Sequence, residues 1–163
     1  MNTVKKFCAA IALTVLASLL GTASAFAEKW DCSGSKKSKT LVSREVIKPG
    51  DRPDRELAQM VRIDIYADGR EETVYEHDDQ IAGTGTHAGY SAINLESGER
   101  VWGKYEGVHS TVVKGDAWET RFWGVFRFTA GTGKYKAIRG AGSYQGIVTP
   151  DGLTAETVCQ AEY

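Results

Sequence analysis

The sequence has few of the residues and none of the motifs that mark the common nucleophile and cofactor enzymes. Among its 163 residues there are three cysteines and three prolines, with no Cys-x-x-Cys pair, no Gly-x-Ser-x-Gly elbow and no phosphate-binding glycine loop. Such motifs position a nucleophile or hold a cofactor. Their absence argues against hydrolase, thiol-redox and nucleotide chemistry, and no cofactor is expected.

An excess of charge of either sign is also missing. The chain has 20 Lys and Arg against 21 Asp and Glu, and the loss of Lys5 and Lys6 with the leader described below leaves 18 against 21. Nucleic-acid binding usually needs a clear basic surface, so no nucleic-acid partner is expected. The one basic cluster, Lys36-Lys37-Ser38-Lys39, is short and is interpreted as a solvated loop.

A long apolar run occurs only once, at residues 7–20, after Lys5 and Lys6 and before Ala25-Phe26-Ala27. This order predicts a cleaved signal peptide over residues 1–27, with cleavage after Ala25 as the alternative to Ala27. The run is shorter than the roughly 20 residues that span a bilayer, so no membrane span is expected after cleavage. The mature chain, residues 28–163, is predicted to be one domain that is periplasmic or secreted.

Cleavage removes Cys8 and leaves two cysteines, Cys32 and Cys159. An even pair in an exported chain predicts a disulfide, which would join the first strand to the last. A loop of this length stabilises the fold by roughly 4–5 kcal/mol in the chain-entropy view, less any strain. A reactive or metal-binding thiol pair is the rival interpretation, but no His or second Cys lies near either cysteine in the sequence.

No helical period appears in the mature chain, whereas alternation and turn residues recur. Glycines inside strands suit a coiled sheet that closes on itself. The sequence therefore predicts an all-β fold, a closed antiparallel up-and-down β-barrel of about eight strands, with a sandwich as the alternative. The expected strands are residues 30–34, 40–47, 56–66, 71–76, 81–94, 100–113, 118–129, 140–148 and 154–163.

The strand predicted over residues 118–129 places aromatic side chains on one face, namely Trp118, Phe122, Phe126 and Phe128. These residues could bind a ring-shaped ligand or form plain core. On the strand over residues 100–113, Tyr105 and His109 share one face and Glu106 lies on the other. Whichever face is the lumen supplies pocket residues, and a buried Glu106 or Tyr105 would be a candidate acid or base.

Glu76-His77-Asp78-Asp79 is the only dense polar cluster. One hypothesis makes it a metal or acid–base site. The other makes it a solvated loop between two strands, because consecutive residues of a strand point to opposite faces and their side chains rarely converge. No metal site is predicted.

A turn motif carries a family resemblance. Gly131-Thr132-Gly133, then Tyr135, then Arg139-Gly140, preceded by Phe126-Arg127-Phe128, resembles the allene oxide cyclase and dirigent barrel superfamily, and in particular exported bacterial proteins of unassigned role. The resemblance implies an eight-stranded barrel, often trimeric in the plant members, with a cavity for an apolar or phenolic molecule. In the motif, Gly131, Thr132, Gly133 and Gly140 shape the turn, and Tyr135 can plug a barrel end.

The sequence therefore predicts an exported, non-catalytic barrel that binds a small apolar or aromatic ligand, or acts as an envelope interaction module. The expected ligand residues are Trp118, Phe122, Phe126, Phe128 and His109. One alternative is a cyclase or isomerase that uses the barrel pocket through Glu106 and Tyr105. A second alternative is a structural protein that associates with copies of itself.

Overall fold

A computed structural model describes residues 27–163. The predicted signal peptide, with Cys8, therefore lies outside the described residues except for Ala27. Within the described part of the chain, no helix is long and apolar enough to cross a bilayer.

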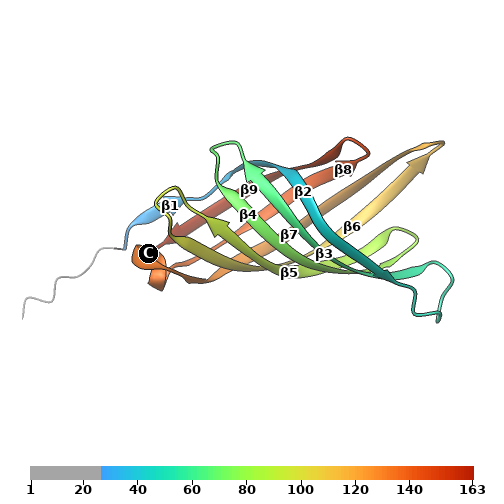
Figure 1. Cartoon of the computed structure of the whole chain (residues 1–163), viewed down its shortest axis with the longest axis horizontal. Coiled ribbons are helices and arrows are strands. Elements are labelled where there is room, and N and C mark those ends of the chain that lie inside the picture. The colour runs from blue at the N-terminus through green and yellow to red at the C-terminus, as the bar shows by residue number, and fades with distance from the viewer. Residues whose placement is uncertain (1–26) are drawn as a thin grey trace, which may run out of the picture.

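The fold is all-β, as predicted, and each strand pairs antiparallel with its neighbours in the sheet. Eight strands form a closed barrel in the order β9-β2-β3-β4-β5-β6-β7-β8, and β8 pairs with β9 to complete the ring (Figure 1). The elements are β1 (Lys29–Asp31), β2 (Gly34–Ile47), β3 (Arg55–Tyr66), β4 (Glu71–Ile81), β5 (Thr84–Asn94), β6 (Arg100–Lys114), β7 (Ala117–Gly131), the 3₁₀ helix η1 (Gly133–Ala137), β8 (Arg139–Thr149) and β9 (Gly152–Glu162).

Closure of the barrel depends on β9, which lies between β8 and the start of the chain. It pairs with β8 from Thr149↔Gly152 to Arg139↔Glu162, but with β2 over four residue pairs only. The short β1 pairs with the end of β9. The predicted disulfide is confirmed: Cys32, between β1 and β2, is bonded to Cys159 on β9.

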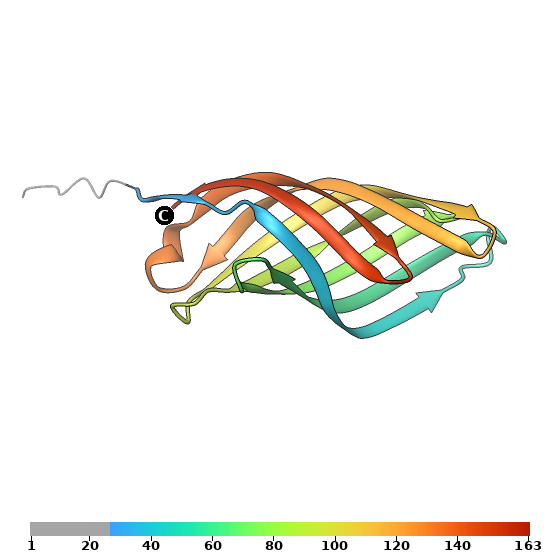
Figure 2. The same ribbon diagram turned by 90° about the horizontal axis from the view of Figure 1, so that it is seen from above.

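The two ends of the barrel differ. Both ends of the described chain lie at one end with η1, while the β2–β3 and β6–β7 hairpins project from the other (Figures 1 and 2). The first end is closed by a buried apolar cluster that includes the disulfide, Val101, Phe128, Tyr135 and Ile138. This closed end is called the floor below, and the opposite end is called the mouth.

Two polar segments that were interpreted as loops are strands in the structure. Lys36 and its neighbours belong to β2, and residues 76–79 belong to β4, which continues to Ile81. The turn after β4 is Ala82-Gly83, where Gly83 has a φ of 75°. The loop interpretation was wrong because it treated charge as a sign of solvent exposure. Here alternate charged residues face the lumen, and strand pairing satisfies the backbone.

Candidate functional site

The lumen holds a cavity of about 1050 Å³ that runs from above the floor to the mouth. Near the floor it is lined by Cys32, Ile93 and Cys159, and at the mouth by residues such as Trp118 and Pro150. This volume is at the upper end of the range for small-molecule sites in proteins. The barrel interior is therefore an open pocket and not a solid core.

The cavity has two chemically different walls. Strand β7 supplies the aromatic wall, where Trp118, Phe122, Phe126 and Phe128 line the cavity. Strands β2, β3 and β4 supply the opposite, charged wall. The charged side chains that line the cavity there, including two from the β2–β3 loop, are Lys36, Arg44, Lys48, Asp54, Glu56, Arg62, Glu72, Glu76 and Asp78. A molecule in this lumen would meet rings on one side and ionisable groups on the other.

The aromatic wall owes its shape to glycines on its own and neighbouring strands. A Cβ at Gly142 or Gly146 of β8 would lie within 2.6 Å of a ring carbon of a β7 phenylalanine, Phe126 or Phe122. A Cβ at Gly124 would lie 2.3 Å from the hydroxyl oxygen of Tyr144. The rings thus lie flat across positions that have no side chain, an arrangement that stabilises glycine in sheets. The in-strand glycines that favoured a barrel therefore also make room for the rings.

Near the floor, a network of paired charges is buried in the charged wall. Lys36 on β2 forms ion pairs with Glu72 on β4 and with Asp64 on β3, the latter at 3.4 Å. Tyr66 donates a hydrogen bond of 3.3 Å to Glu72. Burial alone would disfavour the charged amine, but Glu72 and the neighbouring acidic groups together outweigh it and hold the pKa of Lys36 above its usual range. Lys36 is therefore charged and is the shared ion-pair partner of the two carboxylates.

The network continues toward the mouth through Arg62. Its guanidinium pairs with Asp64 at 3.2 Å and with Glu76 at 3.0 Å, and Tyr105 donates a hydrogen bond of 2.9 Å to the other Glu76 oxygen. Burial favours the neutral form of Glu76, yet the charge of Arg62 and the hydrogen bonds from Tyr105 and Arg62 contribute to outweighing it, and the pKa of this carboxyl is lowered. Burial and the adjacent Glu76 charge raise the pKa of Tyr105 far above 10, so it is a hydrogen-bond donor and not a base.

Two histidines lie at the centre of the lumen. The Nε2 atom of His87 is 2.7 Å from the hydroxyl oxygen of Tyr144, and the Nε2 atom of His109 is 3.1 Å from Oε1 of Gln80. Burial lowers the pKa of His87 to about 4 and also lowers the pKa of His109. Both rings are therefore neutral at physiological pH. The centroids of the two rings are 5.7 Å apart, and the rings lie on β5 and β6, between the charged and the aromatic wall.

Asp78 differs from the other carboxylates of the lumen. It lies on β4, opposite Ala58 of β3 and His87 of β5, and lines the cavity. Its Oδ1 atom, like that of Asp64, is buried without a hydrogen-bond partner among residues 27–163, but unlike Asp64 it forms no ion pair there. Burial, reinforced by the charge of Glu76, raises the pKa of Asp78 to about 7. A buried carboxyl with no partner that faces a cavity is a candidate ligand contact.

The structure brings the predicted ligand residues together. The four aromatic residues of β7 and His109 all line the lumen. Of the two acid–base candidates, Tyr105 faces the lumen, whereas Glu106 is exposed on the outer face of β6. The polar cluster at residues 76–79 is divided between the two faces of β4: Glu76 and Asp78 line the cavity, whereas His77 and Asp79 do not.

The turn motif lies at the floor. Oγ1 of Thr132 accepts a hydrogen bond of 2.8 Å from the backbone N–H of Arg100, and Gly133 has a φ of 57°. The Tyr135 ring is buried, 5.6 Å from the Trp30 ring and 4.2 Å from the Tyr163 ring. The motif closes the barrel end and contributes no group to the cavity.

Sequence reasoning missed the charged wall. Lys36, Arg62 and Glu72 were not candidates, and neither were the lumen residues His87 and Tyr144, whereas Asp78 was considered only as part of the cluster at residues 76–79. One signal was present in the sequence: three of the four residues at alternate positions 72, 74, 76 and 78 of β4 are charged, namely Glu72, Glu76 and Asp78. Together with the apolar Val61, Ile63 and Ile65 on the other face of β3, that period could have indicated a polar interior.

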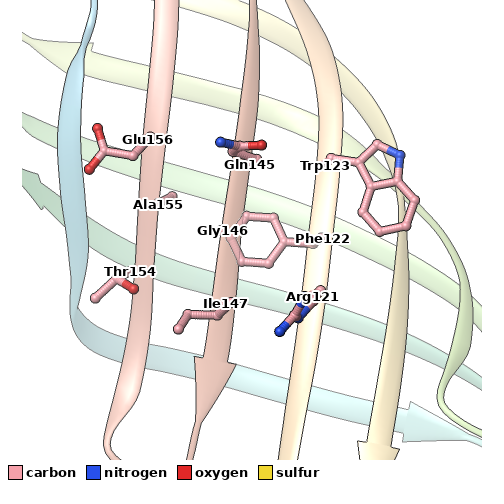
Figure 3. Close-up of a pocket in the computed structure, with 9 residues that line it drawn as sticks. All are labelled: Arg121, Phe122, Trp123, Gln145, Gly146, Ile147, Thr154, Ala155 and Glu156. Carbon is pink, nitrogen blue, oxygen red and sulfur yellow. The ribbon is translucent and has the colours of Figure 1, made fainter.

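A second, smaller hollow lies on the outer face of β7, β8 and β9. Its volume is about 360 Å³, and Figure 3 shows the residues that line it, Arg121, Phe122, Trp123, Gln145, Gly146, Ile147, Thr154, Ala155 and Glu156. A Cβ at Gly146 would lie 2.4 Å from the Phe122 ring, so at this glycine the ring is covered only by backbone. The hollow is shallow, and Arg121, which lines it, already forms an ion pair with Glu119.

Among residues 27–163, no group of three or more His, Cys, Asp or Glu side chains is arranged to hold a metal ion. No protein-family model matches the sequence, and no curated protein matches it.

Proposed function

We propose that this protein is an exported, non-catalytic barrel that binds a small ring-bearing molecule in its lumen. The proposal of export is supported by the leader-like residues 1–27 and by the disulfide, which persists in oxidising compartments. We also propose that the chain is a distant member of the allene oxide cyclase and dirigent barrel superfamily. The turn motif and the eight-stranded barrel support that relation.

One observation carries the binding proposal: the lumen is a large cavity, closed at the floor, with an aromatic wall opposite a charged wall. A barrel whose interior served stability alone would be filled by side chains at close packing. The cavity instead offers ring contacts from β7 on one side and polar and charged groups from β2, β3 and β4 on the other, and small-molecule sites likewise combine apolar contacts with placed polar groups.

A cyclase or isomerase function is the second candidate, and the observation that favours it is the set of titratable groups facing the cavity. Asp78 titrates near neutral pH, and Tyr105 donates toward the same space. Binding without catalysis has the stronger support, because Glu76 already accepts hydrogen bonds from both Tyr105 and Arg62. A substrate would have to break that network to use either group.

The neutral fluorescent probe N-phenyl-1-naphthylamine tests the lumen as a binding site. The blocking variant is Val148→Trp, because Val148 lines the cavity near the mouth. The matched control is Ile147→Trp, since Ile147 is the next residue of β8 and its side chain lies on the outer face, 38 % exposed. We expect enhanced probe fluorescence with the wild-type protein and the control, and at least about tenfold weaker binding by the blocking variant.

The proposal is wrong if the wild-type protein does not bind the probe. It is also wrong if both tryptophan variants bind as the wild type does, because the probe would then be on the outer surface. Circular dichroism and reversible unfolding of each variant show whether the barrel remains folded.

A further inference from the structure

Within residues 27–163, the charged wall contains one acid that forms no ion pair, Asp78. Lys36 already pairs with two carboxylates, and so does Arg62, which bridges Asp64 and Glu76. Asp78 forms no ion pair within the described chain, and its Oδ1 atom has no hydrogen-bond donor there. An unmatched buried acceptor costs roughly 1–3 kcal/mol, so a donor that arrived with a ligand would recover this free energy.

The groups around Asp78 determine which ligand charge fits. Glu76 on the same strand repels an anion, and Arg62 on β3 already forms ion pairs with Asp64 and Glu76. His87, opposite Asp78 on β5, is neutral because burial lowers its pKa to about 4. Arg44 on β2 is exposed and makes no ion pair with Asp78. A cation meets an unpaired carboxyl here, whereas Arg44, the cavity-lining cation of the described chain that forms no ion pair, is exposed to solvent, which screens its charge.

Two neutral groups contact the lumen neighbours of Asp78, which are Gln80 on β4 and His87 on β5. The His109 ring on β6 is bonded to Gln80, and the Tyr144 hydroxyl on β8 is bonded to His87. Beyond them lie the rings of Phe122 and Phe126. A flat ring can therefore lie against the aromatic wall while a substituent on it extends toward β4.

We propose that the molecule bound in the lumen is a ring-bearing amine, and that its protonated amino group donates hydrogen bonds to the Asp78 carboxylate. This inference rests on the proposed lumen-binding function and adds the charge class of the ligand. Charge-assisted hydrogen bonds are the stronger kind. Hydrogen bonds to charged groups typically contribute an amount that corresponds to about a 10- to 100-fold preference in affinity.

Three compounds with one ring and different side arms test the inference: tryptamine, 3-ethylindole and indole-3-propionate. The arms carry a positive charge, no charge and a negative charge, so differences in affinity report the preferred sign. Isothermal titration calorimetry at pH 8 should show tryptamine binding at least about tenfold more tightly than the other two.

The Asp78→Asn variant keeps the size of the side chain and removes the charge. We expect it to bind tryptamine and 3-ethylindole with similar affinity, whereas the control Glu106→Gln, which changes a carboxylate on the outer face, should keep the full preference. For the wild type, tryptamine affinity should rise about fourfold between pH 6.5 and 8 as Asp78 ionises, while the amine stays protonated. The variant should show no such rise.

The outcomes separate the two proposals. If N-phenyl-1-naphthylamine binds in the lumen but tryptamine binds no better than 3-ethylindole, or if indole-3-propionate binds best, the amine inference is overturned and lumen binding stands. A tryptamine preference that survives in Asp78→Asn also overturns the inference. If neither the probe nor any indole binds, lumen binding itself fails, and the inference fails with it.

Discussion

Replacing Asp78 with asparagine should change how the stability of the barrel depends on pH. In the folded chain, burial raises the pKa of Asp78 from 3.8 to about 7, whereas the unfolded chain restores the ordinary value. Between these two values the folded state binds more protons than the unfolded state. The free energy of unfolding of the wild type therefore contains a contribution that falls as the pH rises from about 4 to about 7, and stays low above that.

The size of this effect follows from the two pKa values. One pKa unit corresponds to about 1.4 kcal/mol, so ionising Asp78 in the folded state costs at most about 4 kcal/mol at high pH. The side chain is only partly buried and the cavity opens at the mouth, so solvent screening reduces that figure. Between pH 4.5 and 8, we expect the Asp78→Asn variant to gain about 2–3 kcal/mol relative to the wild type.

Urea denaturation of both proteins at a series of pH values measures this difference. Other groups titrate in the same range. The lowered pKa of His87, for example, makes stability fall as the pH drops from about 6.5 to about 4. Such contributions are common to both proteins and cancel when the two curves are subtracted. If the stability difference stays constant between pH 4.5 and 8, Asp78 is not a buried acid with a raised pKa, and the reasoning fails.

Two further substitutions test the walls of the lumen. Lys36→Met leaves two buried carboxylates without their shared partner and should lower the free energy of unfolding by about 3–5 kcal/mol. The control Lys37→Met changes an exposed neighbour and should alter the free energy of unfolding by about 0.5 kcal/mol or less. Equal effects of the two substitutions would contradict the buried network. Gly124→Ala places a Cβ against the backbone of β6 and the Tyr144 hydroxyl and should cost about 1–3 kcal/mol. Gly103→Ala, with no atom closer than 3.3 Å, should cost clearly less in the same urea titration.

The fold was largely predictable from the sequence because its signals are local. The aromatic alternation of β7, the Asp68-Gly69 turn and the in-strand glycines each depend on residues close together in the chain. The disulfide was predictable by elimination, since only Cys32 and Cys159 remain after the leader. These features need no knowledge of which face of the sheet points inward.

The charged wall was not predictable in the same way, because it depends on side-chain contacts between different strands, with partners such as Arg62 and Glu76 or Lys36 and Glu72 lying 14 and 36 residues apart. Lys36 meets Glu72, 36 residues later, and Arg62 meets Glu76 across a strand pair. In the sequence each of these residues resembles an ordinary solvated charge. Strand pairing and barrel closure place them inside, and Asp78 is recognised as unmatched only when the partners of the others are known.

The charged lumen is better explained by binding than by stability. Buried ion pairs are often no more stabilising than apolar side chains of similar size, and an unpartnered Asp78 is destabilising. The barrel can tolerate this cost because the apolar floor and the Cys32–Cys159 disulfide stabilise one end independently of the lumen. Where a fold maintains a polar network and one unmatched acid beside an open cavity, the missing partner is reasonably sought in the molecule that fills the cavity.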